Sequence, residues 1–204
     1  KNPAFAAVLD SADLLAPDGI LAILVARIHG YHIRKRETGP GLLWRFSEAA
    51  NLKGYKYFFY GDTVETLALL SAKLTKEFPD LKIVGCQSPP FRDLTPEEDA
   101  AMVASINEAM PDVLWIGLGM PKQEQWIFEH REALNVPVVV GAGASFKFIS
   151  GTVRRAPAWV RNLGFEWLWR LAREPRRVWR RALIDAPRFA SHVVLELAGI
   201  RKYD

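Results

Sequence analysis

The feature that most constrains this chain is a repeated alternation of helix-like segments with short apolar runs that end at or near glycine. Apolar residues recur at helical spacing in six segments, residues 3–12, 20–30, 41–53, 63–78, 95–110 and 121–134. Short runs rich in β-branched and aromatic residues occupy 55–61, 81–87, 112–119 and 136–143. This alternation predicts an α/β fold, in which helices cover a Rossmann-like sheet of mainly parallel strands.

The helix expected over 95–110 has a local start signal. Thr95 suits the N-cap position, Pro96 suits the first turn, and Glu98 completes a capping box. Ligands of parallel sheets bind at the carboxyl ends of the strands. We therefore expect a binding site in the glycine-rich loops that follow the apolar runs, and Gly143 is one residue of such a loop.

The composition changes after about residue 153, where the chain becomes rich in arginine and holds four of the seven tryptophans. From Lys147 to Asp204, basic residues outnumber acidic ones by eight, so a net charge of +4 leaves −4 on the first 146 residues. We expect an α/β core over 1–153 and an Arg/Trp-rich helical appendage over 154–204. A basic segment on an acidic body indicates an anionic partner, either a phosphate group, a nucleic acid or a lipid surface.

The loop after the apolar run VLWI contains more special residues than a turn needs. Its candidate binding residues are Gly117, Gly119, Pro121, Lys122, Gln123 and Glu124. Glycine permits positive φ and close backbone approach, and a helix that begins at Pro121 would direct free N–H groups at an anion. A strand-to-helix turn with solvated polar residues is the alternative.

The segment ADLLAPDGI, residues 12–20, places one carboxylate among apolar residues. Partial burial would raise the pKa of Asp18 toward the range of a general base. The alternative is that Pro17-Asp18-Gly19 is a turn in which Asp18 only caps the helix that starts near Ile20. The local pattern leaves both readings open.

Arginines recur at helical spacing in the C-terminal segment, with tryptophans between them. Arg170, Arg173, Arg177 and Arg180 share one face if a helix continues through Pro175, although proline also favours a new helix start there. Such a face suits a phosphate clamp or a membrane interface, and a solvated basic surface is the alternative. Arg155, which follows Gly151, offers a second anion contact. No nucleic-acid-binding motif accompanies the charge, so we expect no nucleic acid partner.

Other features set the expected compartment. No apolar stretch approaches the roughly 18 residues that span a bilayer, and no secretory signal pattern is visible. The single cysteine, Cys86, has no partner for an internal disulfide, so we expect a reducing cytoplasm. The four histidines lack metal-ligand spacing.

Three segments together resemble the WecG/TagA/CpsF family of bacterial glycosyltransferases. They are ADLLAPDGI, IGLGMPKQEQWI and the long stretch GASFKFISGTVRRAPAWVRNLGFEWLWRLAREPRRVWR. The resemblance covers nearly the whole chain.

The resemblance implies an inverting transfer of a sugar from a UDP-sugar, commonly a UDP-N-acetylhexosamine such as UDP-ManNAc, to a polyprenyl-diphosphate-linked acceptor. It assigns the general base to Asp18, in the P-D-G segment with Gly19, and a substrate-site position to Gln123. It implies that Arg155, Arg170, Arg173 and Arg177 reach the diphosphate at the membrane surface. The enzyme would need no metal and no cofactor, and would lie in the cytoplasm, peripheral on the inner face of the cell membrane.

Three features of this sequence depart from the family pattern, one missing strand and two replaced acids. The expected Thr-x-Asn strand upstream of the first helix is missing from this sequence, Gly41 replaces the acid of R-x-x-G-x-D, and Lys147 replaces the acid of F-D. These departures motivate an alternative, a non-catalytic sugar-nucleotide-binding or scaffolding subunit of a polysaccharide assembly complex. The Trp–Arg surface would also serve a subunit interface, so a homo-oligomer stays open.

Overall fold

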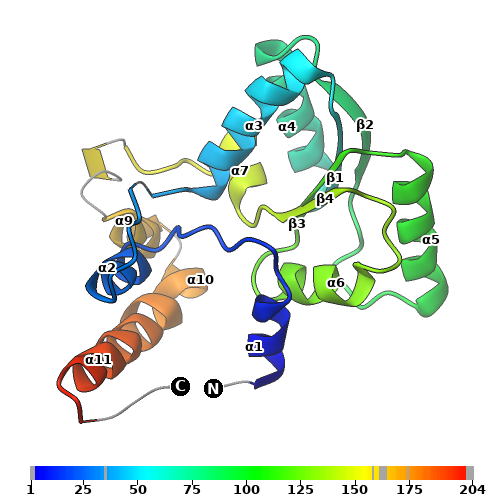
Figure 1. Cartoon of the computed structure of the whole chain (residues 1–204). Helices are drawn as coiled ribbons and strands as arrows, with labels where there is room; N and C mark the ends of the chain where they lie inside the picture. The colour runs from blue at the N-terminus through cyan, green and yellow to red at the C-terminus, as the bar shows by residue number, and fades with distance from the viewer. Residues whose placement is uncertain (1–2, 35, 158, 161–164, 174, 201–204) are drawn as a thin grey trace. The chain divides into compact units, whose positions relative to one another are not determined.

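The computed structural model describes residues 3–34, 36–157, 159–160, 165–173 and 175–200, with the side chains of Arg177 and Arg181 outside the description. The chain forms two compact units (Figure 1). Unit 1 comprises Lys1–Ala16 and Glu37–Arg154, and unit 2 comprises Pro17–Arg36 and Arg155–Asp204. From the sequence, the boundary between core and appendage was expected near residue 153. In the structure, Pro17–Arg36 belongs to the same unit as the C-terminal segment.

Unit 1 is built on a four-stranded parallel sheet with the strand order β2-β1-β3-β4. Its strands are β1 (Lys56–Gly61), β2 (Lys82–Gln87), β3 (Val113–Gly117) and β4 (Val138–Gly141). Each lies inside one of the apolar runs of the sequence. The predicted α/β fold with a parallel sheet is therefore confirmed.

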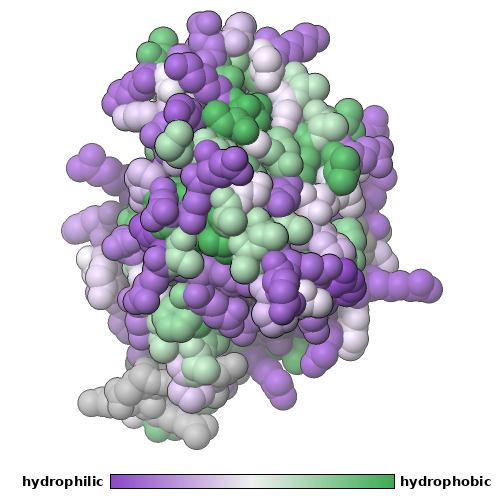
Figure 2. Space-filling view, turned by 90° about the vertical axis from the view of Figure 1, so that its right-hand side faces the viewer, coloured by the Kyte–Doolittle hydropathy of each residue, from purple (hydrophilic) through white to green (hydrophobic). Residues whose placement is uncertain are grey.

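The sheet is flanked by α3 (Gly39–Lys53), α4 (Val64–Glu77), α5 (Pro96–Glu108), α6 (Lys122–His130) and α7 (Ser145–Ser150). Helix α1 (Pro3–Asp10) packs on α6. The capping box predicted from Thr95 and Glu98 is present at the start of α5. On the face shown in Figure 2, hydrophilic side chains are interspersed with apolar ones, as expected for a solvated surface.

Helix α6 ends at His130, before the predicted end at residue 134. The side chain of Asn107 provides the reason. Its Nδ2 donates to the main-chain oxygen of Ala133 at 2.8 Å, and its Oδ1 accepts from the main-chain nitrogen of Asn135 at 2.8 Å. Asn107 thus binds the main chain on both sides of Leu134 and holds it in a non-helical path after α6.

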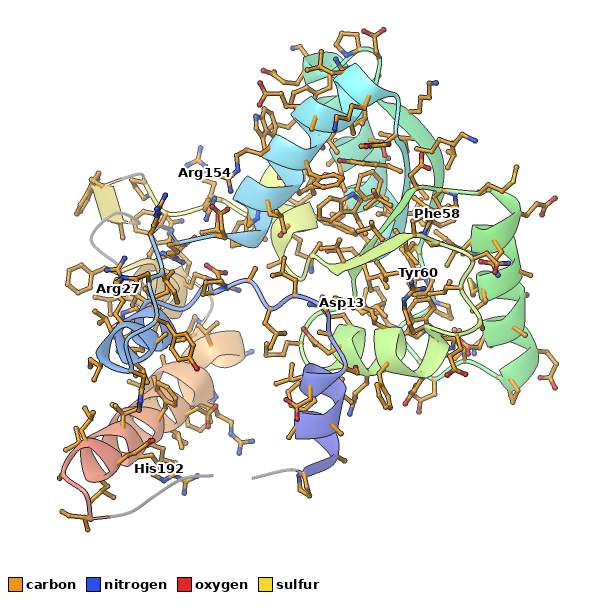
Figure 3. All side chains as sticks on the ribbon, in the orientation of Figure 1. Asp13, Arg27, Phe58, Tyr60, Arg154 and His192 are labelled. Carbon is orange, nitrogen blue, oxygen red and sulfur yellow. The ribbon has the colours of Figure 1, made fainter. Side chains whose placement is uncertain are left out.

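Successive side chains of a strand point to opposite faces of the sheet, and helices cover both faces. Tyr57 and Phe59 of β1 pack with α3, α4 and α7, whereas Phe58 and Tyr60 pack with α5 and α6 (Figure 3). Strand β3 is buried along its whole length. Strands covered on both sides leave only their ends accessible, and these ends are where side chains can meet a ligand.

The regular elements described in unit 2 are all helices. Its elements are α2 (Ile20–Ile28), α9 (Glu166–Arg173), α10 (Pro175–Arg180), the π-helix η1 (Arg181–Asp185) and α11 (Ala186–Leu197). Helix α10 is described from Pro175 onward, and the expected helix start there depends on residue 174, which lies outside the described residues. Among the described residues, no helix has the length and apolar character that crossing a bilayer requires.

Candidate functional site

The carboxyl ends of β1 and β3 form the switch point of the sheet. Strand β2 lies on one side of β1 and β3 on the other, so the chain reverses its direction of winding here. Ligands of open parallel sheets bind outside this point. Gly61 and Gly117 pair across it, and a Cβ atom on Gly61, where φ is +114°, would lie 2.7 Å from the carbonyl carbon of Gly117. The two backbones therefore touch, and only glycine fits at position 61.

The two glycines of the loop after β3 have different surroundings. A Cβ atom on Gly117 would lie 2.4 Å from Cδ2 of Phe146, so the aromatic ring fills the space beside this glycine. Gly119 has a φ of +81° and open space around it. Close approach at Gly117 is made by Phe146, whereas Gly119 has the positive φ that its sequence context predicted.

Gln123 is buried in the first turn of α6, with 6% of its surface exposed. Its Oε1 accepts a hydrogen bond from the main-chain nitrogen of Gly143 at 2.9 Å. A Cβ atom on Gly141 would lie 2.8 Å from its Nε2. Gln123 thus fixes the loop that follows β4 and brings two predicted binding residues, Gln123 and Gly143, together.

Glu124, the next residue, has one carboxylate oxygen that binds Gln123 and one that accepts no hydrogen bond within the described part of the chain. Its Oε1 accepts from Gln123 Nε2 at 2.8 Å, while its buried Oε2 has no hydrogen-bond partner among the described residues. A buried carboxylate oxygen without a partner is costly, and a ligand hydroxyl would satisfy it. Pro121 and Lys122 are exposed beside it.

An ion pair that the sequence patterns did not reveal lies at the end of β1. Asp62, which has a φ of +55° and a side chain only 3% exposed, places Oδ1 3.6 Å from Nζ of Lys147 on α7. The same oxygen accepts from the main-chain nitrogen of Thr63 at 2.9 Å. Lys147 stands where the family pattern has an acid, and a carboxylate is present beside it, contributed by Asp62.

His130 belongs to a structural cluster on the other face of the sheet. Its Nε2 lies 2.5 Å from Asp99 Oδ2 and its Nδ1 lies 2.8 Å from the main-chain oxygen of Trp126, so both ring nitrogens are engaged. Burial, with a smaller effect of the Asp99 charge, raises the pKa of Tyr60 to about 12 in this cluster. Among the described residues, no three His, Cys, Asp or Glu side chains are grouped to hold a metal ion.

Asp18 lies in unit 2 with 56% of its side chain exposed. Helix α2 is capped by Gly19, and no side chain donates or accepts a capping bond there, so the reading of Asp18 as an N-cap is wrong. Arg36 holds Asp18 instead. Its Nε lies 2.6 Å from the main-chain oxygen of Asp18 and its Nη2 lies 3.0 Å from Oδ1.

A chain of alternating charges extends from Asp18 within unit 2. Arg36 Nη2 donates to Glu166 Oε2 at 3.3 Å, and Arg155 Nε donates to Glu166 Oε1 at 3.0 Å. Of these residues, sequence patterns indicated Asp18 and Arg155 but neither Arg36 nor Glu166. No local signal could identify that pair, because 130 positions separate the two residues in the sequence.

The remaining candidate arginines follow along the C-terminal helices of unit 2. Arg170 and Arg173 lie on α9, where the guanidinium of Arg173 stands over the Trp169 ring at 5.2 Å from its centroid. Such cation–π contact orients an arginine without neutralising it. Arg177 lies on α10, with its side chain outside the described residues.

Comparisons with known proteins complete the description. Residues 1–203 match the family model of the glycosyl transferase WecG/TagA/CpsF family. An N-acetylglucosaminyldiphosphoundecaprenol N-acetyl-β-D-mannosaminyltransferase of Bacillus spizizenii is 32% identical over 194 residues, which cover 95% of this chain and 73% of the relative. A protein of the same name from Bacillus subtilis is 31% identical over 189 residues, covering 93% of this chain and 71% of the relative.

Proposed function

The chain belongs to the glycosyl transferase WecG/TagA/CpsF family, and from that premise we propose that it transfers an N-acetylhexosamine such as ManNAc from a UDP-sugar to a polyprenyl-diphosphate-linked acceptor. The observation that carries this proposal is the identity of 32% over 95% of the chain to a relative whose name states such an acceptor and a mannosaminyl transfer. The product would enter bacterial cell-surface polysaccharide synthesis.

The residues of unit 1 suit recognition of the donor. Gly119, Pro121 and Lys122 expose the start of α6 at the end of β3, and a helix start stabilises negative charge. The unpartnered Oε2 of Glu124 can accept a sugar or ribose hydroxyl. Gln123 orders Gly143 through a hydrogen bond. Its side-chain amide is a further polar group that can contact the donor.

The residues of unit 2 suit the chemistry. Asp18 acts as the general base that removes the proton from the acceptor hydroxyl while UDP leaves from the opposite face of the sugar, which inverts the anomeric centre. The departing UDP gathers negative charge, and fixed cations stabilise such charge without a metal. Arg155, Arg170, Arg173 and Arg177 are the cations that this proposal assigns to the diphosphate.

A polyprenyl acceptor remains in the bilayer, so the enzyme has to work at the membrane surface. Unit 2 exposes large apolar side chains in its basic C-terminal segment, among them Trp159 at 67% and Trp179 at 45%. Apolar groups interspersed with basic residues bind lipid interfaces. We assign peripheral membrane contact to this segment.

Asp18→Asn tests the mechanism. We expect transfer from UDP-ManNAc to a polyprenyl-diphosphate-linked GlcNAc acceptor to fall about 10²- to 10⁴-fold, the usual contribution of a general base. Product formation is measured by mass spectrometry, and UDP binding by calorimetry should persist. Asp13→Asn is the matched control, because Asp13 is exposed and lies on the segment after α1 (Figure 3). Undiminished transfer by Asp18→Asn would exclude Asp18 as the base.

A further inference from the structure

Glu166 is a buried carboxylate that joins two cations of unit 2. It is the first residue of α9 and is only 8% exposed. Its two oxygens are used separately, Oε2 by Arg36 at 3.3 Å and Oε1 by Arg155 at 3.0 Å. A carboxylate is costly to bury unless it is paired. The two ion pairs therefore connect Arg36 and Arg155 to one buried carboxylate.

Arg36 grips Asp18 at two points. Its Nε donates to the main-chain oxygen of Asp18 at 2.6 Å, and its Nη2 lies 3.0 Å from Oδ1. A guanidinium bound to both backbone and side chain sets the direction of the carboxylate as well as its place. Within the described part of the chain, Oδ2 of Asp18 makes no hydrogen bond, so one oxygen stays available to a proton.

We propose that Glu166 is a positioning residue for the proton transfer by Asp18. It holds Arg36, and Arg36 holds the turn Pro17-Asp18-Gly19 through the main-chain oxygen and Oδ1 of Asp18, so that Oδ2 is left to accept the proton. Without Glu166, the long side chain of Arg36 is free to adopt other rotamers and the turn loses its anchor. The proposal rests on the assignment of Asp18 as the base in the proposed function.

Steady-state kinetics of the full chain test this role. For Glu166→Ala we expect kcat to fall about 10- to 100-fold, because small misplacements of a reacting group have effects of that size, while KM for the UDP-sugar changes little. Glu166→Gln, which keeps the side-chain volume and one oxygen, should lie nearer to the wild type. Glu196→Gln is the matched control, since Glu196 pairs with His29 at 3.9 Å, also in unit 2. A raised KM with unchanged kcat would overturn the proposal.

A double-mutant cycle identifies the route of the effect. If Glu166 acts through Arg36, Glu166→Ala lowers kcat in the wild-type background and adds almost nothing in an Arg36→Ala background. Effects that multiply independently would show that Glu166 acts by another path, and the proposal would be wrong. Circular dichroism confirms that each variant is folded, and Glu166→Gln replaces Glu166→Ala in the cycle if the latter is not.

A third measurement does not depend on turnover. Amide hydrogen exchange over residues 17–36 should rise in Glu166→Ala and stay at the wild-type level in Glu196→Gln, because only the first removes the anchor of Arg36. If the wild-type protein transfers no sugar while this exchange response is present, the proposed function fails and the positioning of Asp18 by Glu166 stands. If exchange over 17–36 is unchanged, the positioning proposal fails whatever the enzyme transfers.

Discussion

At the end of β3, Gly117 has only a hydrogen atom where a larger side chain would clash with the ring of Phe146. Replacing Gly117 by alanine puts a methyl group 2.4 Å from the ring, and the strand or the ring has to move. We expect the free energy of unfolding to fall by about 1–3 kcal/mol, the usual cost of overpacking a core. Denaturant unfolding followed by circular dichroism measures the change.

The size of Phe146 provides the control for this substitution. Phe146→Leu should recover part of the lost stability in a Gly117→Ala background, because the smaller side chain vacates the contested position. A Gly117→Ala protein as stable as the wild type would mean that the ring moves without cost. Sequence reasoning marked Gly117 as special, but it could not name Phe146, which lies 29 positions later and approaches only in the folded chain.

At the scale of the element, helix α5 begins with a charged cluster that responds to pH. Hydrogen bonds from Arg92, and then from the main-chain nitrogen of Thr95, lower the pKa of Glu98 from its ordinary value of 4.5 to about 2. Because the folded-state pKa is depressed, the carboxylate stabilises the helix start fully above about pH 4.5, and this contribution is lost as the pH falls through about 2.

Arg92→Gln should therefore raise the pKa of Glu98 toward its ordinary value, as measured by NMR titration of the side-chain carboxyl. Glu97 is the internal control, since its lowered pKa arises from hydrogen bonds of its own backbone and of Thr95. We expect the pKa of Glu97 to stay the same in the variant. An unchanged Glu98 pKa would show that Arg92 does not bind it in solution.

Elements were predicted well where their signals are local. The capping box of α5 involves residues three positions apart, and strand β3 is recognisable from its own apolar run. The end of α6 was predicted too late because Asn107, on another helix, binds the chain after His130. The same limit applies to the site. Gly143 was expected in a binding loop, but its bond to Gln123, twenty positions earlier, depends on packing that no local pattern records.

At the scale of the whole molecule, charge divides the chain, with a surplus of eight positive charges from Lys147 onward and a net −4 before it. We expect the protein to sediment with vesicles that contain anionic lipids, and this binding to weaken as salt is added. Replacing Arg176 and Arg180 of α10 with Gln should weaken it by up to about 1 kcal/mol for each charge removed.

A matched pair on α4 provides the control. Lys73 and Lys76 are exposed cations of unit 1, and their replacement by Gln removes the same charge from the other part of the chain. We expect that variant to bind vesicles as the wild type does. Equal weakening by both pairs would indicate that total charge, rather than the C-terminal segment, decides membrane binding.

Unit 2 is assembled from two stretches that are far apart in the sequence, so it can fold only after both have been synthesised. Arg36 is synthesised 130 residues before Glu166. During synthesis, Arg36 and the turn around Asp18 therefore lack the carboxylate that anchors them in the folded chain. The entropy of closing so long a loop is recovered only when the late helices arrive. The turn around Asp18 therefore gains its anchor only after synthesis has passed Glu166 at the start of α9.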